Sequence, residues 1–176
     1  MIYNDLRIKD LISMGHIQGA EEKQVNPASL NIRLGYSFLR PKRPCDVTLG
    51  KEVEYNTEYL YGNECTYIMP GEFILATTIE KFSIPHDVAA FVQGRSSIGR
   101  IGLMIQNAGF VDPGFNGHIT LELKNDSPNA IKLIPGYPVG QMVFFSCELV
   151  DKPYCGKYQG QIEATGSRME LDNYEL

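Results

Sequence analysis

The sequence predicts an all-β protein, a distorted β-barrel or jelly roll with one short helix near its N-terminus. Most apolar stretches are short and rich in β-branched and aromatic residues, and turn signals separate them at close spacing. Strands so closely spaced are typical of antiparallel barrels and sandwiches. The 176 residues have the length of one domain and contain no repeat or linker, so we expect a single domain over 1–176.

The one segment with helical periodicity lies at residues 6–14. Its apolar side chains recur at the spacing of one helix face: Leu6, Ile8, Leu11 and Ile12. Gly15 is suited to end the helix, and Asn4 or Asp5 is suited to cap its first turn.

The other apolar stretches predict seven strands. They cover residues 28–39, 65–70, 72–85, 89–94, 118–125, 130–135 and 140–150. Turns rich in Pro, Gly, Asp and Asn separate them, for example at 112–117 and 135–138. The chain from 157 to 176 is polar, so we expect a mobile C-terminal tail unless it docks on another surface.

The charge, the hydropathy and the cysteine pattern argue against several classes of function. The net charge is −5 and the 16 Lys and Arg are spread along the chain, so we expect no nucleic-acid partner. No apolar run approaches the roughly 18 residues of a membrane span, and the N-terminus lacks a signal-peptide pattern, so we expect a cytoplasmic protein without a membrane partner. Cys45, Cys65, Cys147 and Cys155 form no CxxC pair, which predicts reduced thiols and no zinc site.

The first segment whose residues indicate a binding site is GRSSIGR, residues 94–100. Its small residues would let backbone N–H groups approach a phosphate, and its two arginines would neutralise the phosphate charge. A turn whose charges face solvent would explain the same composition.

Two carboxylates follow within 28 residues. The stretch from Ile119 to Lys124 alternates strictly, which turns Glu122 away from the leucines on either side of it. Asp112 begins a Pro-Gly turn. The plain alternatives are a solvated polar strand face for Glu122 and local backbone bonding for Asp112.

The stretch GRSSIGRIGL (94–103), followed by AGFVDPGFNGHITLELKN (108–125), resembles the signature of the dCTP deaminases, relatives of the trimeric dUTPases. Further stretches agree with the family in order and spacing: 28–35, 70–85, 135–144 and 153–161. The resemblance implies a barrel of the dUTPase-like type and a homotrimer with active sites between subunits. It also implies dCTP and dUTP as ligands, with Mg²⁺ carried on the phosphates and no metal held by the protein.

The resemblance also implies roles for individual residues. Glu122 would be the general base of deamination, with Arg100 orienting it. Ser96 and the carbonyl of Ala108 would hold the attacking water, and Asp112 would approach the deoxyribose 3′-hydroxyl. The other implied nucleotide contacts come from Arg95, Ser97, Ile98, Gly99, Thr120, Leu121, Tyr154, Lys157 and Gln161.

The chemistry of deamination suits these residue types. Water attacks C4 of cytosine, and ammonia leaves from the tetrahedral intermediate. Zinc-dependent base deaminases carry H-x-E and P-C-x-x-C patterns, which do not occur here, so a carboxylate would move the protons without zinc. Burial would raise the pKa of Glu122, while Arg100 would oppose that rise.

The segment before Asp112 bears on the product. Many family members have His-x-Thr-Ala there, whereas this chain has Gln106-Asn107-Ala108-Gly109 and is one residue shorter. Residues 108–112 instead resemble the dUTPase motif Ala-Gly-Val-Ile-Asp and the members that convert dCTP through to dUMP. We therefore expect dUMP and pyrophosphate, within pyrimidine deoxynucleotide biosynthesis.

Two alternatives remain open. A dUTPase without deaminase activity usually has Gly where this chain has Ser97, and its glycine-rich C-terminal loop is reduced here to residues 164–168. A non-catalytic nucleotide-sensing trimer would be favoured by loss of Glu122 or Ser96, and both are present. Such a sensor would bind dTTP or dUTP, and for the predicted enzyme dTTP is a possible inhibitor.

Overall fold

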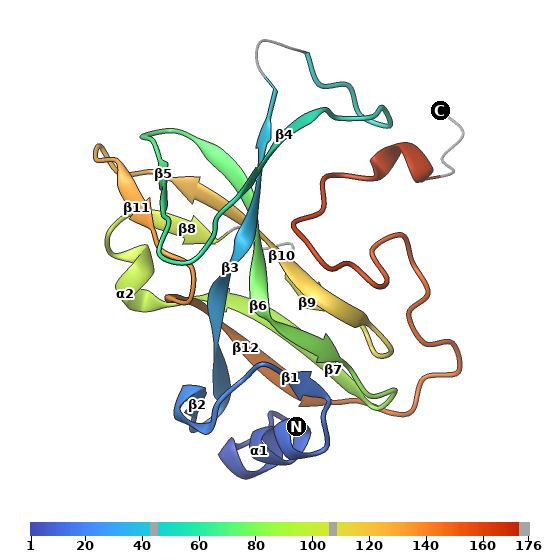
Figure 1. Ribbon diagram of the computed structural model, residues 1–176. Coiled ribbons are helices and arrows are strands. Elements are labelled where there is room, and N and C mark those ends of the chain that lie inside the picture. Colours follow the sequence, from blue (N-terminus) through green and yellow to red (C-terminus); the bar gives the residue numbers. More distant parts are fainter. Residues whose placement is uncertain (43–45, 106–108, 173–176) are drawn as a thin grey trace.

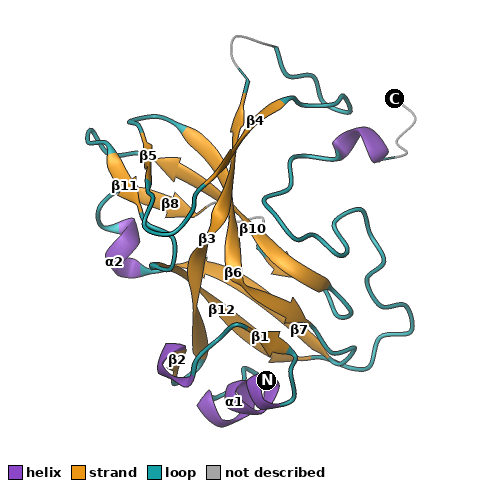
Figure 2. Ribbon diagram, in the orientation of Figure 1, coloured by secondary structure: helices purple, strands orange, loops and turns teal. Residues whose placement is uncertain are grey.

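The computed structural model describes residues 1–42, 46–105 and 109–172. Strands curl into a barrel with one helix at its base, and the C-terminal tail runs along one side (Figure 1). Colouring by secondary structure confirms the predicted all-β barrel with a short N-terminal helix (Figure 2). No helix in these described ranges is both long enough and apolar enough to span a bilayer.

Helix α1 (Asp5–Ser13) forms where the periodicity predicts it. The Asn4 side-chain oxygen accepts the Arg7 backbone N–H at 3.1 Å, which caps the first turn. Gly15, with φ +79°, follows its C-terminal end. Ile8 and Leu11 are buried, so the apolar face packs on the barrel.

All seven expected strands are present, with bounds shifted by a few residues. They are β3 (Ser29–Pro41), β5 (Thr66–Ile68), β6 (Phe73–Ser83), β7 (Val88–Gly94), β10 (Asn116–Asn125), β11 (Ile131–Leu133) and β12 (Pro138–Ser146). The sequence did not predict the remaining elements. These are β1 (Ile17–Gln18), η1 (Glu22–Gln24), β2 (Val25–Asn26), β4 (Tyr55–Tyr59), α2 (Ser96–Gly99), β8 (Leu103–Ile105), β9 (Phe110–Val111) and η2 (Met169–Leu171).

Strand β3 joins the two halves of the barrel. The main sheet has the order β8-β10-β6-β3-β12-β7-β9, with β1 beside β6 and with β2 and β4 beside β3, while β11 and β5 form a small separate sheet. The first part of β3 pairs with β12 and its later part with β6 and β4. Where β3 meets β6, Gly35 is required, because a Cβ there would lie 2.5 Å from Cγ2 of Thr77.

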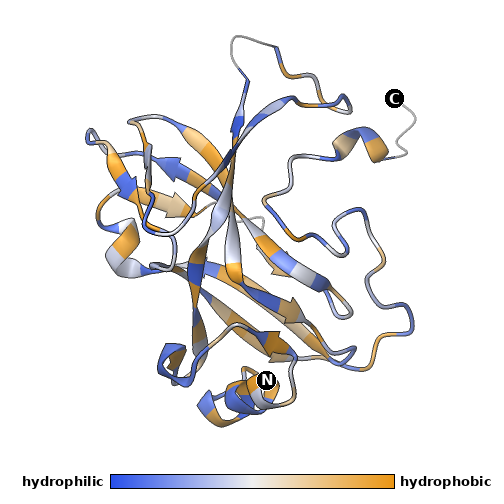
Figure 3. Cartoon of the chain, in the orientation of Figure 1, coloured by the Kyte–Doolittle hydropathy of each residue, from blue (hydrophilic) through white to orange (hydrophobic). Residues whose placement is uncertain are grey.

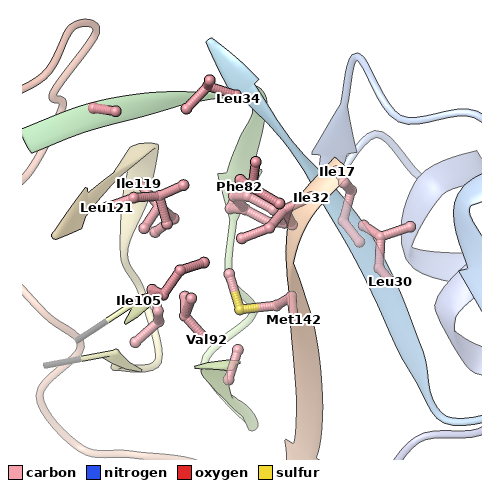
Figure 4. Packing of buried hydrophobic residues seen from close by; sticks show 14 of the residues in the cluster. Ile17, Leu30, Ile32, Leu34, Phe82, Val92, Ile105, Ile119, Leu121 and Met142 are labelled. Atoms are coloured by element: carbon pink, nitrogen blue, oxygen red, sulfur yellow. The ribbon is translucent and has the colours of Figure 1, made fainter. Parts of the chain in front are cut away.

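The core fills the barrel with side chains from several strands. Ile32, Phe82, Leu121 and Met142 are fully buried and lie together in Figure 4. Hydrophobic and hydrophilic residues intermix along the strands in Figure 3, as expected when only one face of each strand is buried. Along β10 buried and less buried positions alternate regularly, so Thr120, Glu122 and Lys124 face away from the core, whereas Asn125 lies on its buried side.

The described part of the tail, residues 157–172, docks on the barrel. The Gly160 N–H donates to the Asn116 carbonyl at 2.7 Å, and the His118 N–H donates to the Gln161 carbonyl at 2.9 Å. Ala164 is buried against a small apolar cluster on the outer face of β3 and β6. The structure thus identifies the surface on which the tail can dock, and the expected mobility of residues 157–176 stays a prediction.

One buried ion pair ties the N-terminal segment to the sheet. The Glu80 side chain has no solvent exposure and accepts hydrogen bonds from Nε of Arg33 at 2.7 Å and from the Arg33 backbone N–H at 2.9 Å. The Gln24 amide donates to it at 2.8 Å. With these donors, the carboxylate is compensated in a place that water does not reach.

Replacing Glu80 by Ala should therefore destabilise the fold by about 3–5 kcal/mol, the usual cost of removing one partner of a buried pair. Urea denaturation of the two chains measures this loss. Glu54→Ala is the matched control, because Glu54 pairs with Lys42 at an exposed position, where ion pairs contribute little. Equal losses in the two variants would contradict the structural role of Glu80.

Candidate active site

A cavity of about 400 Å³ lies between the polar side of β10 and the docked tail. Its volume is in the range of small-molecule sites, about 300–1,000 Å³. It brings together six of the residues that the sequence singles out: Asp112, Thr120, Leu121, Glu122, Tyr154 and Gln161. We call this cavity the carboxylate cleft.

Glu122 faces the cleft because its strand neighbours Leu121 and Leu123 face the core. Its register partner is Leu75 of β6, so the carboxylate lies above an apolar surface. Within the described residues its side chain makes no hydrogen bond or ion pair. Burial raises the pKa of Glu122. A carboxylate with a raised pKa is suited to accept and return a proton near neutral pH.

Thr120 links the tail to the strand that carries Glu122. Its hydroxyl donates to Oε1 of Gln161 at 3.2 Å and accepts the Thr165 backbone N–H at 3.0 Å. Thr120 and Glu122 lie on the same side of β10. The tail therefore forms the wall of the cleft beside the carboxylate.

The other end of the cleft lies at the turn that Asp112 begins. Asp112 is exposed at this end. The Tyr154 backbone N–H donates to the Pro113 carbonyl at 2.8 Å, and the Tyr154 ring packs on Phe115 with centroids 5.9 Å apart. The start of the tail is thus held close to Asp112.

The residues of the GRSSIGR segment lie in a different cleft. Arg95, Ser96, Ser97 and Gly99 line a second cavity of about 600 Å³, which we call the arginine cleft. Ser96 and Ser97 are exposed, and Nη1 of Arg95 donates to the Pro138 carbonyl at 2.8 Å. Segment 94–100 is therefore an open surface around α2, the short helix that the sequence did not predict.

Within one chain the two clefts have almost separate linings. Among their described lining residues they share only Ile105. In Figure 1, α2 and the tail lie on opposite sides of the molecule. Arg100 is exposed, and within the described ranges its side chain contacts neither Glu122 nor Ser96 through a hydrogen bond or ion pair.

The remaining predicted site residues are not among the described lining residues of either cleft. Ile98 is the buried residue of α2 and lines neither of the two clefts. Nζ of Lys157 lies 2.6 Å from the Asp172 carboxylate, and the hydrogen bond to Asp172 raises the pKa of this lysine. The predicted water ligand Ala108 lies outside the described residues.

The cleft also contains residues that the sequence did not suggest. Tyr55 of β4 lines it, together with Phe73 and Leu75 of β6. Segment 55–59 has too few apolar residues to indicate a strand. The tail residues Thr165 and Ser167 also line the cleft, and these two the sequence does offer, as donors suited to phosphate oxygens. Gly166 lies between them.

The fold and the carboxylate cleft define the protein as a small-molecule-binding β-barrel with groups for acid–base chemistry. Residues 2–147 match the model of the dCTP deaminase-like family. The chain belongs to this family, which confirms the resemblance seen in the sequence.

Two named relatives align with this chain over almost its whole length. A "dCTP deaminase, dUMP-forming" of Sulfurihydrogenibium sp. is 42% identical, with the alignment covering 98% of this chain and 99% of the relative. A protein of the same name from Persephonella marina is 40% identical, with the same coverage of both chains.

A solved structure supports the fold. The 2′-deoxycytidine 5′-triphosphate deaminase of Agrobacterium tumefaciens superimposes with a TM-score of 0.66 at 22% identity. The match covers 81% of this chain and 47% of the solved chain, so this chain spans about half the length of that protein. At this level of identity the likeness concerns the fold alone.

Glu122→Gln should stabilise the fold at neutral pH and have less effect at acid pH. Burial raises the folded-state pKa of Glu122, so between its unfolded and folded pKa values the folded state binds more protons. Stability therefore falls as the pH rises through that window, and the neutral amide avoids this loss. Thermal melting of both chains from acid to neutral pH measures the difference. A melting-temperature difference that stays constant with pH would contradict the assignment.

Proposed function

We propose that the chain is a dCTP deaminase of the dUMP-forming type. It would release ammonia from dCTP and cleave the triphosphate, with dUMP and pyrophosphate as products. The observation that carries the proposal is Glu122, which is partly buried in a cleft of small-molecule size and has no partner among the described residues. Full-length relatives with 40–42% identity are named for this activity.

In the first step, water would add to C4 of the cytosine. Glu122 would take one proton from the water and pass it to N3 of the ring, and would then take the hydroxyl proton of the tetrahedral intermediate and pass it to the departing amine. Both protons of the water are thus moved, and dCTP and water become dUTP and ammonia. A raised pKa supports this role, because the group must be a competent base and then a competent acid. The Leu75 surface beneath it supports the exclusion of bulk water.

In the second step, water would attack the α-phosphorus and pyrophosphate would leave. Asp112 is the carboxylate at the mouth of the cleft, and we assign it the activation of this water or the contact with the 3′-hydroxyl. Mg²⁺ would enter with the substrate on the phosphate oxygens, as is common for this ion. Within the described residues no three His, Cys, Asp or Glu side chains gather as a metal site, and independence from zinc stays a prediction.

A complete site would combine two subunits of a homotrimer. The support is geometric: Ser96 and Arg100 are exposed on one side of the chain, while Glu122 lies in a cleft on the other. Ser96 and Arg100 of one subunit would meet Glu122 of the next, with Arg95 and Ser97 near the phosphates. Each subunit would thus give its arginine cleft to one neighbour and its carboxylate cleft to the other.

The tail would complete the site over the triphosphate. Gln161 and Tyr154 already line the cleft, whereas Lys157 is bonded to Asp172. A triphosphate would compete with the Asp172 carboxylate for this ammonium, since phosphate oxygens offer more charge to the same donor. Ordering the tail costs roughly 1–2 kcal/mol per residue in backbone entropy, so a highly charged ligand would favour the closed form.

Incubation of the chain with dCTP and Mg²⁺ should yield ammonia, dUMP and pyrophosphate, separated by chromatography. Glu122→Gln should keep nucleotide binding but lose a factor of about 10²–10⁴ in rate, because the amide cannot accept the water proton. Glu148→Gln, at an exposed position outside both clefts, is the matched control.

The other possible outcomes would each indicate a different activity. Accumulation of dUTP would show that the chain deaminates dCTP but does not cleave the triphosphate. Turnover of dUTP without turnover of dCTP would indicate a dUTPase alone, and binding without any turnover would indicate a nucleotide sensor. Near wild-type turnover by Glu122→Gln would overturn its role as the base.

Mixed assemblies test the shared site. Light scattering should give three times the 19.7 kDa chain mass. Ser96→Ala and Glu122→Gln should each be inactive alone, yet co-expression should restore part of the activity, because some interfaces then join an intact Ser96 to an intact Glu122. An active monomer, or no recovery in verified mixed assemblies, would contradict a site shared between subunits.

A further inference from the structure

Three backbone N–H groups of the tail are bound by hydroxyl groups of the barrel. The pairs are Ala164 with Oγ of Ser37 at 3.2 Å, Thr165 with Oγ1 of Thr120 at 3.0 Å, and Ser167 with the hydroxyl of Tyr55 at 3.2 Å. These acceptors come from β3, β10 and β4, so three strands hold one short piece of chain. A polar segment is thereby fixed through its backbone rather than through a hydrophobic core.

Between these bonds, Gly166 lies directly on the ring of Tyr55. A Cβ at this position would come within 2.5 Å of Cε2 and 2.8 Å of Cδ2 of that ring. Contacts this short do not occur, so any larger residue must move the tail or the ring. Tyr55 thus contacts the tail twice, through its ring face and through its hydroxyl.

Tyr55 packs against the tail and not in the main hydrophobic core. Strand β4 pairs with β3 at its edge, and residues 55–59 contribute nothing to the main hydrophobic core. The Tyr55 ring instead packs on the small cluster of Leu39, Leu75 and Ala164. Tyr59, four residues further along the strand, donates its hydroxyl to Glu163 of the tail at 2.5 Å.

The segment that Tyr55 holds forms part of the Glu122 site. Thr165, Gly166 and Ser167 line the carboxylate cleft together with Tyr55 itself. Thr120, which binds the Thr165 N–H, is two residues from Glu122 on the same side of β10. Displacement of this segment would open the cleft beside the carboxylate.

We propose that Tyr55 is a positioning residue that holds tail residues 164–167 as the outer wall of the carboxylate cleft. It touches the tail and acts through it, and it has no direct part in proton transfer. Its catalytic consequence rests on the proposed deaminase function, whereas its hold on the tail does not.

A double-mutant cycle on the full chain tests the proposal, using Tyr55→Ala, Gly166→Ala and the combination. Trypsin cleavage after Lys157 and Arg168, followed by mass spectrometry, reports release of the tail. The KM and kcat for dCTP report the site. Tyr67→Ala is the matched control, because Tyr67 is an exposed tyrosine on β5 that lines neither cleft.

Gly166→Ala should speed tail cleavage and raise the KM for dCTP at least about threefold, with a smaller change in kcat. In the Tyr55→Ala background the same substitution should have almost no further effect, because the ring that the new Cβ would strike is gone. Tyr55→Phe keeps the ring and should recover most of what Tyr55→Ala loses, apart from roughly the two- to tenfold contribution of one hydrogen bond. Unchanged melting temperatures would show that the barrel stays folded.

Equal effects of Gly166→Ala in both backgrounds, or a Tyr55→Ala chain with unchanged tail cleavage, would overturn the proposal. Failure of the wild-type chain to convert dCTP would overturn the proposed function instead. In that case the cleavage cycle would still decide whether Tyr55 holds the tail.

Discussion

The alternation of side chains along β10 is the constraint on which the site depends. Leu121 and Leu123 fill the core, and for that reason Glu122 faces the carboxylate cleft. Pairing with β6 on one side and β8 on the other sets this register. A shift by one residue would turn Glu122 inward and the leucines outward, so the packing energy of the core also positions the candidate base.

Burial has opposite consequences for two carboxylates of this chain, Glu80 and Glu122. Glu80 is fully buried but receives donors from Arg33 and Gln24, so it serves the fold. Glu122 has no partner within the described residues, and partial burial raises its pKa. An uncompensated carboxylate in a cleft lowers stability near neutral pH, and such groups concentrate at functional sites.

The tail connects this site to the rest of the fold without a core of its own. Hydroxyl groups on three strands accept its backbone N–H groups, and Gly166 allows its close approach to Tyr55. These bonds are buried or partly buried but few. In the proposed closure, a ligand that adds charge contacts would favour the docked tail. In the proposed trimer, the neighbouring subunits would be a further source of such contacts, because the predicted site residues are divided between two clefts.

Local pattern alone determined much of this protein: helix α1, seven of the strands, the side of β10 on which Glu122 lies, and the family resemblance that the comparisons confirm. These features follow from the periods of side-chain direction and from motifs, which short stretches of sequence contain. Only the tertiary structure placed β4 beside the tail and separated Ser96 and Arg100 from Glu122. Contacts between distant segments depend on how strands cross and pair, and that information is spread over the whole chain rather than present in any one stretch.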